Sequence, residues 1–221
     1  MTPIVVVSSP LVGAGAMSEL AEALRGLGRQ VAVPEVAFEL ATFTDCVQAA
    51  CGSSSAAPVV VGYSAAGPRL FHVAGRADVA GLVFLDARLP DHDVAPDADP
   101  RFRGLLDALP TDAHHTVPPW SEWWPREVLE QLVPDPQRRA TLAAGCGRPP
   151  RAMFSQPIPA PDVDAPCAFV GLGDGYAGDA EAAARLGWPV EVIPHAHHLW
   201  PVTNPAAVAS AVGAMVDRLV P

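Results

Sequence analysis

A serine stands between a short apolar run and the start of a helical pattern, in the hexapeptide GYSAAG at positions 62–67. A serine hydroxyl acts as a nucleophile when a sharp strand-to-helix turn exposes it, and small neighbours are needed for such a turn. Gly62 and the three residues after Ser64 are small. Ala66 stands where the usual motif has glycine and differs from it by one methyl group. The alternative to a nucleophile is a serine that merely caps a helix. We interpret Ser64 as the candidate nucleophile.

Three histidines crowd the loop HAHH at positions 195–198, between the last apolar run and the last helical pattern. A base in this place can reach the serine hydroxyl over the edge of a sheet. His198 precedes an apolar residue and lies seven positions before Pro205, so we predict His198 as the general base and His197 as second choice. His195 and His197 alternate along the chain as metal ligands can. They lack an acidic or cysteine partner at ligand spacing, and no metal is predicted.

Two aspartates are candidates for the acid that orients the base. Asp174 stands between glycines after the penultimate apolar run, which is the usual place in the chain order serine, acid, histidine. Asp86 ends the apolar run that follows the Ser64 turn, and such a strand suits the buried acid that holds a histidine Nδ1. Chain order favours Asp174 by little, and both candidates stay open.

The oxyanion formed during acyl transfer needs two backbone N–H donors. Ala65, directly after the serine, is predicted to supply the first. The loop after the first apolar run should supply the second, and because Pro10 has no N–H, Leu11 or Val12 is the expected donor.

These residues must be positioned by an alternation of apolar runs and helical patterns. The runs are short, rich in β-branched residues and often apolar on both faces, as in parallel strands covered by helices; they are Ile4–Val7, Gln30–Val33, Pro58–Gly62, Gly81–Asp86, Cys167–Leu172 and Pro189–Ile193. Helical patterns lie between or after them, at Ser18–Leu27, Thr44–Ala50, Gly67–Ala74, Asp179–Leu186 and Pro205–Leu219. The pattern predicts an α/β fold with a doubly wound, mostly parallel sheet of about six strands.

The alternation breaks in a long stretch dense in proline, aspartate and tryptophan. We predict that residues 88–160 form a helical lid inserted after the strand ending at Asp86, within a single domain over 1–221. The run PPWSEWWP at 118–125 brings three tryptophans together. They are expected to pack on the sheet or to line an apolar substrate pocket; the predicted substrate-binding residues are Tyr63, Trp120, Trp123, Trp124 and His197.

The composition excludes several classes of function. The net charge of −10 argues against nucleic-acid binding, and all 14 basic residues are arginine, which excludes lysine Schiff bases and a P-loop. The four cysteines lack metal spacing and suit a reducing compartment. No apolar run approaches the roughly 20 residues of a membrane helix, and no signal peptide is recognised. We expect a cytoplasmic protein with a small-molecule substrate, no cofactor, and no nucleic-acid or membrane partner; a homodimer is compatible with the sequence.

The chain resembles the α/β-hydrolase superfamily over essentially its whole length. More narrowly it is similar to a group of small actinobacterial-type α/β-hydrolase proteins with the patterns G-x-S-x-A-G-P, V-F-x-D-A-x-L-P, P-P-W-S-E-W-W and G-W-P-V, found here at Gly62–Pro68, Val83–Pro90, Pro118–Trp124 and Gly187–Val190. The resemblance implies the fold and a Ser-His-Asp triad. In the narrower group the aspartate of the second pattern recurs, which gives weight to Asp86.

The expected function is a serine hydrolase, esterase-like or thioesterase-like, that cleaves a small or medium apolar ester, thioester or lactone through an acyl-enzyme. A first alternative is a non-hydrolytic biosynthetic reaction on the same fold, such as elimination, cyclisation or lactonisation, because a tryptophan-rich lid can exclude water. A second is a catalytically inactive ligand-binding protein, for which Ala66 and the crowded histidine loop are the only support.

Overall fold

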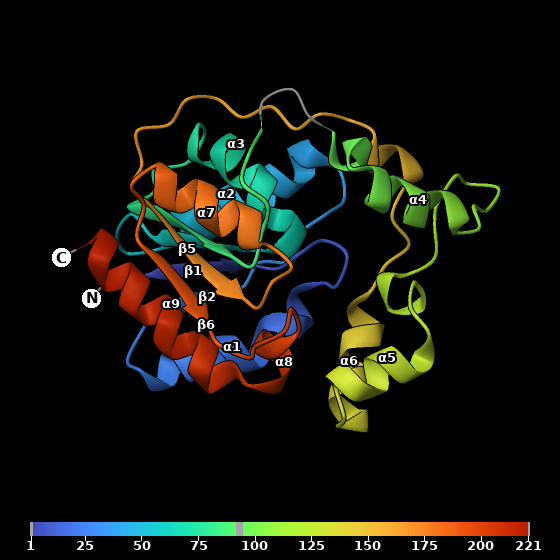
Figure 1. Cartoon of the computed structure of the whole chain (residues 1–221). Coiled ribbons are helices and arrows are strands. Elements are labelled where there is room, and N and C mark those ends of the chain that lie inside the picture. Colours follow the sequence, from blue (N-terminus) through green and yellow to red (C-terminus); the bar gives the residue numbers. More distant parts are fainter. Residues whose placement is uncertain (1, 92–94, 221) are drawn as a thin grey trace.

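Six short runs, most of them β-branched, form a single parallel sheet with the strand order β2-β1-β3-β4-β5-β6 (Figure 1). The structure is a computed structural model and describes residues 2–91 and 95–220. The strands are β1 (Ile4–Val7), β2 (Val31–Ala32), β3 (Val59–Tyr63), β4 (Gly81–Leu85), β5 (Cys167–Leu172) and β6 (Val190–Ile193). Every adjacent pair is parallel, which confirms the predicted α/β fold and the expected number of strands.

Helices lie between the strands and after the last strand. They are α1 (Ser18–Gly26), α2 (Leu40–Gly52), α3 (Leu70–Ala74), α4 (Pro100–Ala108), α5 (Arg126–Leu132), α6 (Pro136–Gly145), α7 (Ala177–Arg185), α8 (Trp200–Thr203) and α9 (Pro205–Leu219). Short 3₁₀ helices span Ala14–Met17, Ser64–Arg69, Pro96–Ala98, Trp120–Glu122 and Arg151–Phe154.

Two of these helices begin three or more residues away from their predicted start, each for a local reason. Helix α2 was expected from Thr44 but begins at Leu40, because the Glu39 carboxylate accepts the first free N–H groups and caps the helix. The helix expected over Gly67–Ala74 is divided into a 3₁₀ turn and α3. Pro68 lies inside that turn and cannot donate a backbone hydrogen bond.

Alternate residues of the central strands face two separate apolar clusters. Ile4, Val59 and Val61 belong to one cluster with buried residues of α1 and α9. Val5 and Val60 belong to the other, with buried residues of α2, α3 and α7. Figure 1 shows these two helix layers on opposite faces of the sheet. Because both faces are covered, β1, β3, β4 and β5 are buried at every position, and their continuous apolar runs follow from that burial.

The segment predicted as a lid, 88–160, contains α4, α5 and α6, and part of it (92–94) lies outside the described residues. In Figure 1 these three helices lie together at the right, apart from the two helix layers. The backbones of α6 and the loop after β1 are in close contact: a Cβ on Gly13 would lie 2.7 Å from the carbonyl oxygen of Gly145. The role of segment 88–160 as a lid stays a prediction.

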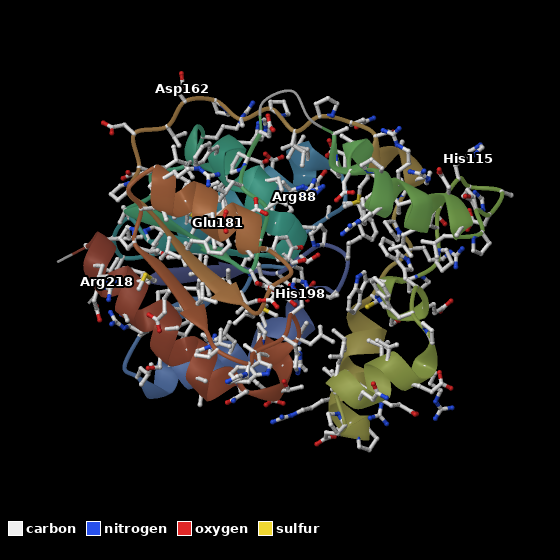
Figure 2. All side chains as sticks on the ribbon, in the orientation of Figure 1. Arg88, His115, Asp162, Glu181, His198 and Arg218 are labelled. Atoms are coloured by element: carbon white, nitrogen blue, oxygen red, sulfur yellow. The ribbon has the colours of Figure 1, made fainter. Side chains whose placement is uncertain are left out.

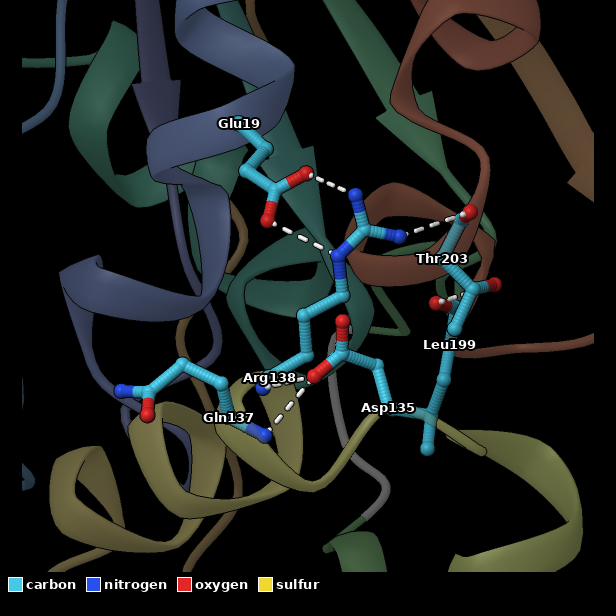
Figure 3. A network of polar contacts seen from close by, with 6 residues as sticks. All are labelled: Glu19, Asp135, Gln137, Arg138, Leu199 and Thr203. Carbon is cyan, nitrogen blue, oxygen red and sulfur yellow. Dashed lines mark hydrogen bonds and ion pairs between the residues drawn. The ribbon is translucent and has the colours of Figure 1, made fainter.

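Arg138 of α6 joins this segment to the sheet-bearing part of the chain (Figure 3). Its Nε and Nη2 lie 3.0 and 2.6 Å from the two carboxylate oxygens of Glu19 on α1. Its Nη1 donates to the carbonyl of Thr203 on α8, at 3.2 Å. Asp135 caps α6 through the N–H groups of Gln137 and Arg138 and so fixes the start of the helix that carries this arginine. A bidentate pair of this kind holds the orientation of the segment more firmly than a single contact does.

Among the described residues, no helix combines the length and the apolar character that crossing a bilayer requires.

Candidate active site

Ser64 stands at the sharp turn between β3 and the 3₁₀ helix that follows. Its φ of 56° lies in the left-handed region, a conformation that costs about 1–3 kcal/mol and gathers at functional sites. Small neighbours make the turn possible: a Cβ on Gly62 would lie 2.8 Å from the side chain of Leu70. A Cβ on Gly67 would lie 2.7 Å from the carbonyl oxygen of Arg88. The glycines therefore allow the close packing that exposes the serine at the end of the strand.

Three predicted residues meet in one chain of hydrogen bonds. Nε2 of His198 lies 3.0 Å from Oγ of Ser64, and its Nδ1 lies 2.6 Å from Oδ2 of Asp86. An ionised carboxylate only accepts hydrogen bonds, so Nδ1 carries the proton and Nε2 is free to accept the serine proton. The other carboxylate oxygen of Asp86 accepts the N–H of Leu172 at 2.8 Å, and Asp86 is buried. In Figure 2, His198 lies on the side of the sheet-bearing part that faces α4–α6.

Two tyrosines hold the imidazole in place. The Tyr63 hydroxyl donates to the carbonyl of His198 at 2.7 Å, and its ring stacks on the imidazole with centroids 4.9 Å apart. The Tyr176 ring lies 5.6 Å from the imidazole, and Tyr176 and Ser64 line the same cavity. Burial raises the pKa of both phenols, so each remains neutral. Sequence reasoning missed Tyr176, whose only signal is its place just after β5.

Asp174 and His197, the other two candidates, lie outside this chain of hydrogen bonds. Asp174 is exposed in the turn before α7, and no hydrogen bond or ion pair between described residues joins its carboxylate to His198. Nδ1 of His197 accepts the N–H of Leu199 at 3.2 Å, and its ring packs edge-on against Trp200. Burial lowers the pKa of His197, and the neighbouring His198 lowers it further. His197 is not among the residues that line the cavity described below.

Leu11 and Val12 are the two candidates for the second N–H donor of the oxyanion site, and their N–H groups have different hydrogen-bond acceptors. The N–H of Val12 donates to the carbonyl of Ser9 at 3.1 Å, within a turn. The N–H of Leu11 donates to the Ser9 hydroxyl at 3.2 Å, and a hydroxyl can rotate away from it. Leu11 and Ala65 both line the cavity beside Ser64, whereas Val12 is not among its lining residues. Leu11 is therefore the better placed of the two.

Ser64 opens into a cavity of about 380 Å³ whose wall includes several aromatic side chains. The lining aromatic residues other than Tyr176 are Phe102, Trp120, Trp123, Trp124 and Phe154. Trp123 is nearly buried, with its indole N–H donating to the carbonyl of Pro118, whereas Trp124 is 37% exposed. Tyr63, which we predicted to contact substrate, is buried beneath the imidazole and does not line the cavity.

Charged groups also lie on this wall, and the sequence analysis did not identify them. Arg88 lies 3.3 Å from the Asp99 carboxylate. Asp179 accepts the N–H of Leu89 at 2.9 Å, and burial raises its pKa while Arg88 acts in the opposite direction. Arg69 is almost fully buried, and desolvation lowers its pKa to about 10. Across residues 2–91 and 95–220, no three side chains of the metal-ligating types converge on a point.

Similar proteins share this fold. An extracellular alpha/beta-hydrolase from a Paenibacillus species is 16% identical, with a TM-score of 0.77 and coverage of 98% of this chain and 99% of that chain. A pyrethroid hydrolase from Sphingobium faniae JZ-2 is 18% identical, with a TM-score of 0.73 and coverage of 98% and 97%. Methylketone synthase I from tomato, complexed with 2-tridecanone, is 11% identical, with a TM-score of 0.75 and coverage of 99% of each chain. At these identities the likeness concerns the fold alone.

Similarity in sequence identifies a family, which the structural likeness alone does not. None of the curated proteins is similar enough to count as a match. The family model described as the alpha/beta hydrolase family, however, matches residues 8–211, which is nearly the whole chain. With its parallel sheet, its serine on a strained turn after β3 and its histidine before the last helices, the chain belongs to the alpha/beta hydrolase family.

Proposed function

We propose that the protein is a serine hydrolase that cleaves an ester or thioester of a small or medium, largely apolar acyl group. The observation that carries this proposal is the continuous chain from the Asp86 carboxylate through His198 to the Ser64 hydroxyl. The hydroxyl opens into a cavity of about 380 Å³, large enough for a small organic molecule and rich in aromatic side chains.

The steps follow from the positions of these groups. Nε2 of His198 takes the Ser64 proton while Oγ attacks the substrate carbonyl carbon, and the oxyanion accepts the N–H groups of Ala65 and Leu11. The tetrahedral intermediate collapses when the C–O or C–S bond breaks and the imidazolium gives its proton to the leaving group. Water then attacks the acyl-enzyme with His198 again as the base, which releases the acid and restores Ser64. Asp86 stabilises the imidazolium and holds its tautomer throughout.

The wall of the cavity supports an apolar acyl group. Burial of apolar surface contributes about 25 cal/mol for each Å² removed from water, and indole and phenyl rings supply much of that surface. We propose that Trp120, Trp124 and Phe102 contact the acyl chain, and that the substrate is a free small molecule in the cytoplasm.

Turnover of 4-nitrophenyl acyl esters of two to eight carbons tests this proposal. The wild-type protein should release nitrophenol, and His198→Ala should reduce kcat by about 10⁴- to 10⁶-fold. The matched variant His197→Ala removes a neighbouring imidazole that does not line the cavity, and it should keep most of the activity. A folded wild-type protein with no turnover, or equal losses in the two variants, would contradict the proposal.

A further inference from the structure

Arg69 is a buried cation at the end of the 3₁₀ helix that begins with the nucleophile. Arg69 is only 3% exposed. Within the described chain, Nε and Nη1 have neither a hydrogen-bond partner nor contact with solvent. Nη2 donates a long bond of 3.4 Å to the carbonyl of Phe38, and the guanidinium lies 5.0 Å from the ring centroid of Phe43. Most of its five N–H donors are therefore unused.

The charge of Arg69 is also left without an ion pair among the described residues. Glu39 contributes a favourable electrostatic interaction, but its two carboxylate oxygens accept N–H groups of Ala41 and Thr42 at the start of α2. Desolvation lowers the pKa of Arg69 to about 10, so the group is still protonated at neutral pH. Burying a charge without a partner opposes folding, and an apolar side chain of similar size is often as stable or more stable there. An arginine at this position therefore has to be explained by something other than stability.

The position of Arg69 relative to Ser64 supplies such an explanation. Arg69 lines the cavity into which Ser64 opens, and it also lines a second cavity of about 210 Å³. The two cavities share three lining residues, Arg69, Met153 and Ile158. Access of a ligand to the buried N–H groups requires side-chain motion in this shared wall, and Met153 has three flexible side-chain bonds.

The other cation on the wall of the Ser64 cavity is already compensated. Arg88 lies 3.3 Å from the Asp99 carboxylate and interacts with Asp179 as well. Arg69, by contrast, lines the same wall without an ion pair among the described residues. One uncompensated charge matches one carboxylate, and a guanidinium binds a carboxylate through two parallel N–H donors.

We propose that Arg69 binds a carboxylate of the substrate, so that the enzyme acts on an ester or thioester that carries one free carboxylate and an apolar chain. This inference rests on the proposed serine hydrolase. A 3₁₀ helix rises about 2 Å per residue, so the backbones of Ser64 and Arg69 are separated by about 10 Å along the helix. Because the arginine side chain covers part of this distance, the apolar chain between the scissile carbonyl and the carboxylate should be shorter, within the range from succinate to suberate.

Paired substrates test the proposal. One series contains the mono-4-nitrophenyl esters of succinate, glutarate, adipate and suberate, and its neutral partners have the free carboxylate converted to an ethyl ester. A second pair, 4-carboxyphenyl butyrate and 4-(ethoxycarbonyl)phenyl butyrate, places the carboxylate on the leaving group. In at least one pair, wild-type kcat/KM should be about 10- to 100-fold higher for the anionic member, as expected for a hydrogen-bonded charge.

Variants assign the preference to Arg69. Arg69→Met should lower kcat/KM for the anionic ester by about 10- to 100-fold and change that of its neutral partner by less than about 3-fold. Arg69→Lys should keep part of the preference, because it retains the charge without the planar fork. Arg126→Gln removes the same charge from an 85% exposed side chain and should leave the preference unchanged.

Binding to Ser64→Ala, measured by calorimetry, separates this inference from the proposed hydrolysis. Mono-ethyl glutarate or adipate should bind more tightly than the diethyl ester, and the second substitution Arg69→Met should abolish the difference. Turnover of neutral esters without any anionic preference, or equal losses on both members of a pair in Arg69→Met, would overturn the inference while leaving the hydrolase intact. A wild-type protein without anionic preference overturns the inference without any variant, and Arg69→Lys keeps the assignment testable where Arg69→Met does not fold.

Discussion

The carboxylate of Asp86 lies 2.6 Å from Nδ1 of His198, although 112 residues separate them along the chain. Pairing of β4 with β5 continues for one residue beyond β4, because the N–H of Asp86 donates to the carbonyl of Val170 at 2.7 Å. The side chain then accepts the N–H of Leu172 at the end of β5. The acid is thus fixed by the sheet itself, at a φ of 42° that few residues other than glycine adopt.

We expect Asp86→Asn to reduce kcat on a 4-nitrophenyl ester by about 10³- to 10⁴-fold, because an amide in this place favours the wrong imidazole tautomer. Asp174→Asn is the matched control. Its side chain is exposed, so unfolding free energy should stay within about 0.5 kcal/mol of wild type and kcat should be nearly unchanged. A large loss for Asp174→Asn with a small one for Asp86→Asn would move the acid to the loop after β5.

The choice between these two aspartates shows where sequence reasoning stops. Apolar runs and their order predict the sheet, because a buried parallel strand has to be apolar on both faces. They do not tell which of two strand ends approaches the histidine loop, since that depends on how β4 and β5 pair and on the backbone angle at Asp86. The candidate nucleophile and base, by contrast, are recognised from local sequence, by the small residues around Ser64 and by the spacing of His198 from Pro205.

Arg69 and Tyr176 were missed for a related reason. Arginines are mostly exposed, and nothing in the segment after the sharp turn at Ser64 (the elbow) distinguishes Arg69 from a surface residue of a helix. Only the packed structure shows that it is buried and lines two cavities together with Met153 and Ile158. The wall of the cavity is built from residues far apart in sequence, so no local pattern identifies it.

Substitution of Gly67 should destabilise the protein and impair its site. A Cβ there would lie 2.5 Å from Cβ of Ala87, next to Asp86, so Gly67→Ala forces the elbow and the end of β4 apart. The expected cost is about 1–3 kcal/mol of unfolding free energy, together with a lower kcat. Gly104→Ala is the control, because a Cβ in that part of α4 meets nothing within 4 Å. It should stabilise by about 0.5–1 kcal/mol; equal effects in urea unfolding would contradict this packing.

The adjacent tryptophans 123 and 124 should respond to substitution in different ways. Trp123 is nearly buried and donates its indole N–H to the carbonyl of Pro118, so Trp123→Ala should cost about 3–5 kcal/mol of unfolding free energy. Trp124 lines the cavity but is 37% exposed. Trp124→Ala should keep the melting temperature near wild type and raise KM for octanoyl esters by about 3- to 10-fold. Unchanged KM with a large loss of stability would assign Trp124 to packing alone.

Buried thiols should react slowly in the native protein. Burial raises the pKa of Cys51 to about 11 and that of Cys167 to about 12, so at pH 8 almost none of either is thiolate. Alkylation of these two residues by iodoacetamide should be negligible at pH 8 in native buffer and complete in urea, as mass spectrometry of the peptides will show. Their rates should increase as the pH approaches the raised pKa. Rapid native alkylation of Cys167 at pH 8 would contradict its burial.

The most direct test of the account is covalent modification of Ser64. A fluorophosphonate reacts with a serine only when a base activates the hydroxyl, so the intact mass of the wild-type protein should shift by one adduct, mapped to the peptide that contains Ser64. Asp86→Asn should slow that labelling strongly, and Ser64→Ala should abolish it. An unlabelled but folded wild-type protein, or an adduct on another serine, would contradict the assignment of Ser64 as the nucleophile.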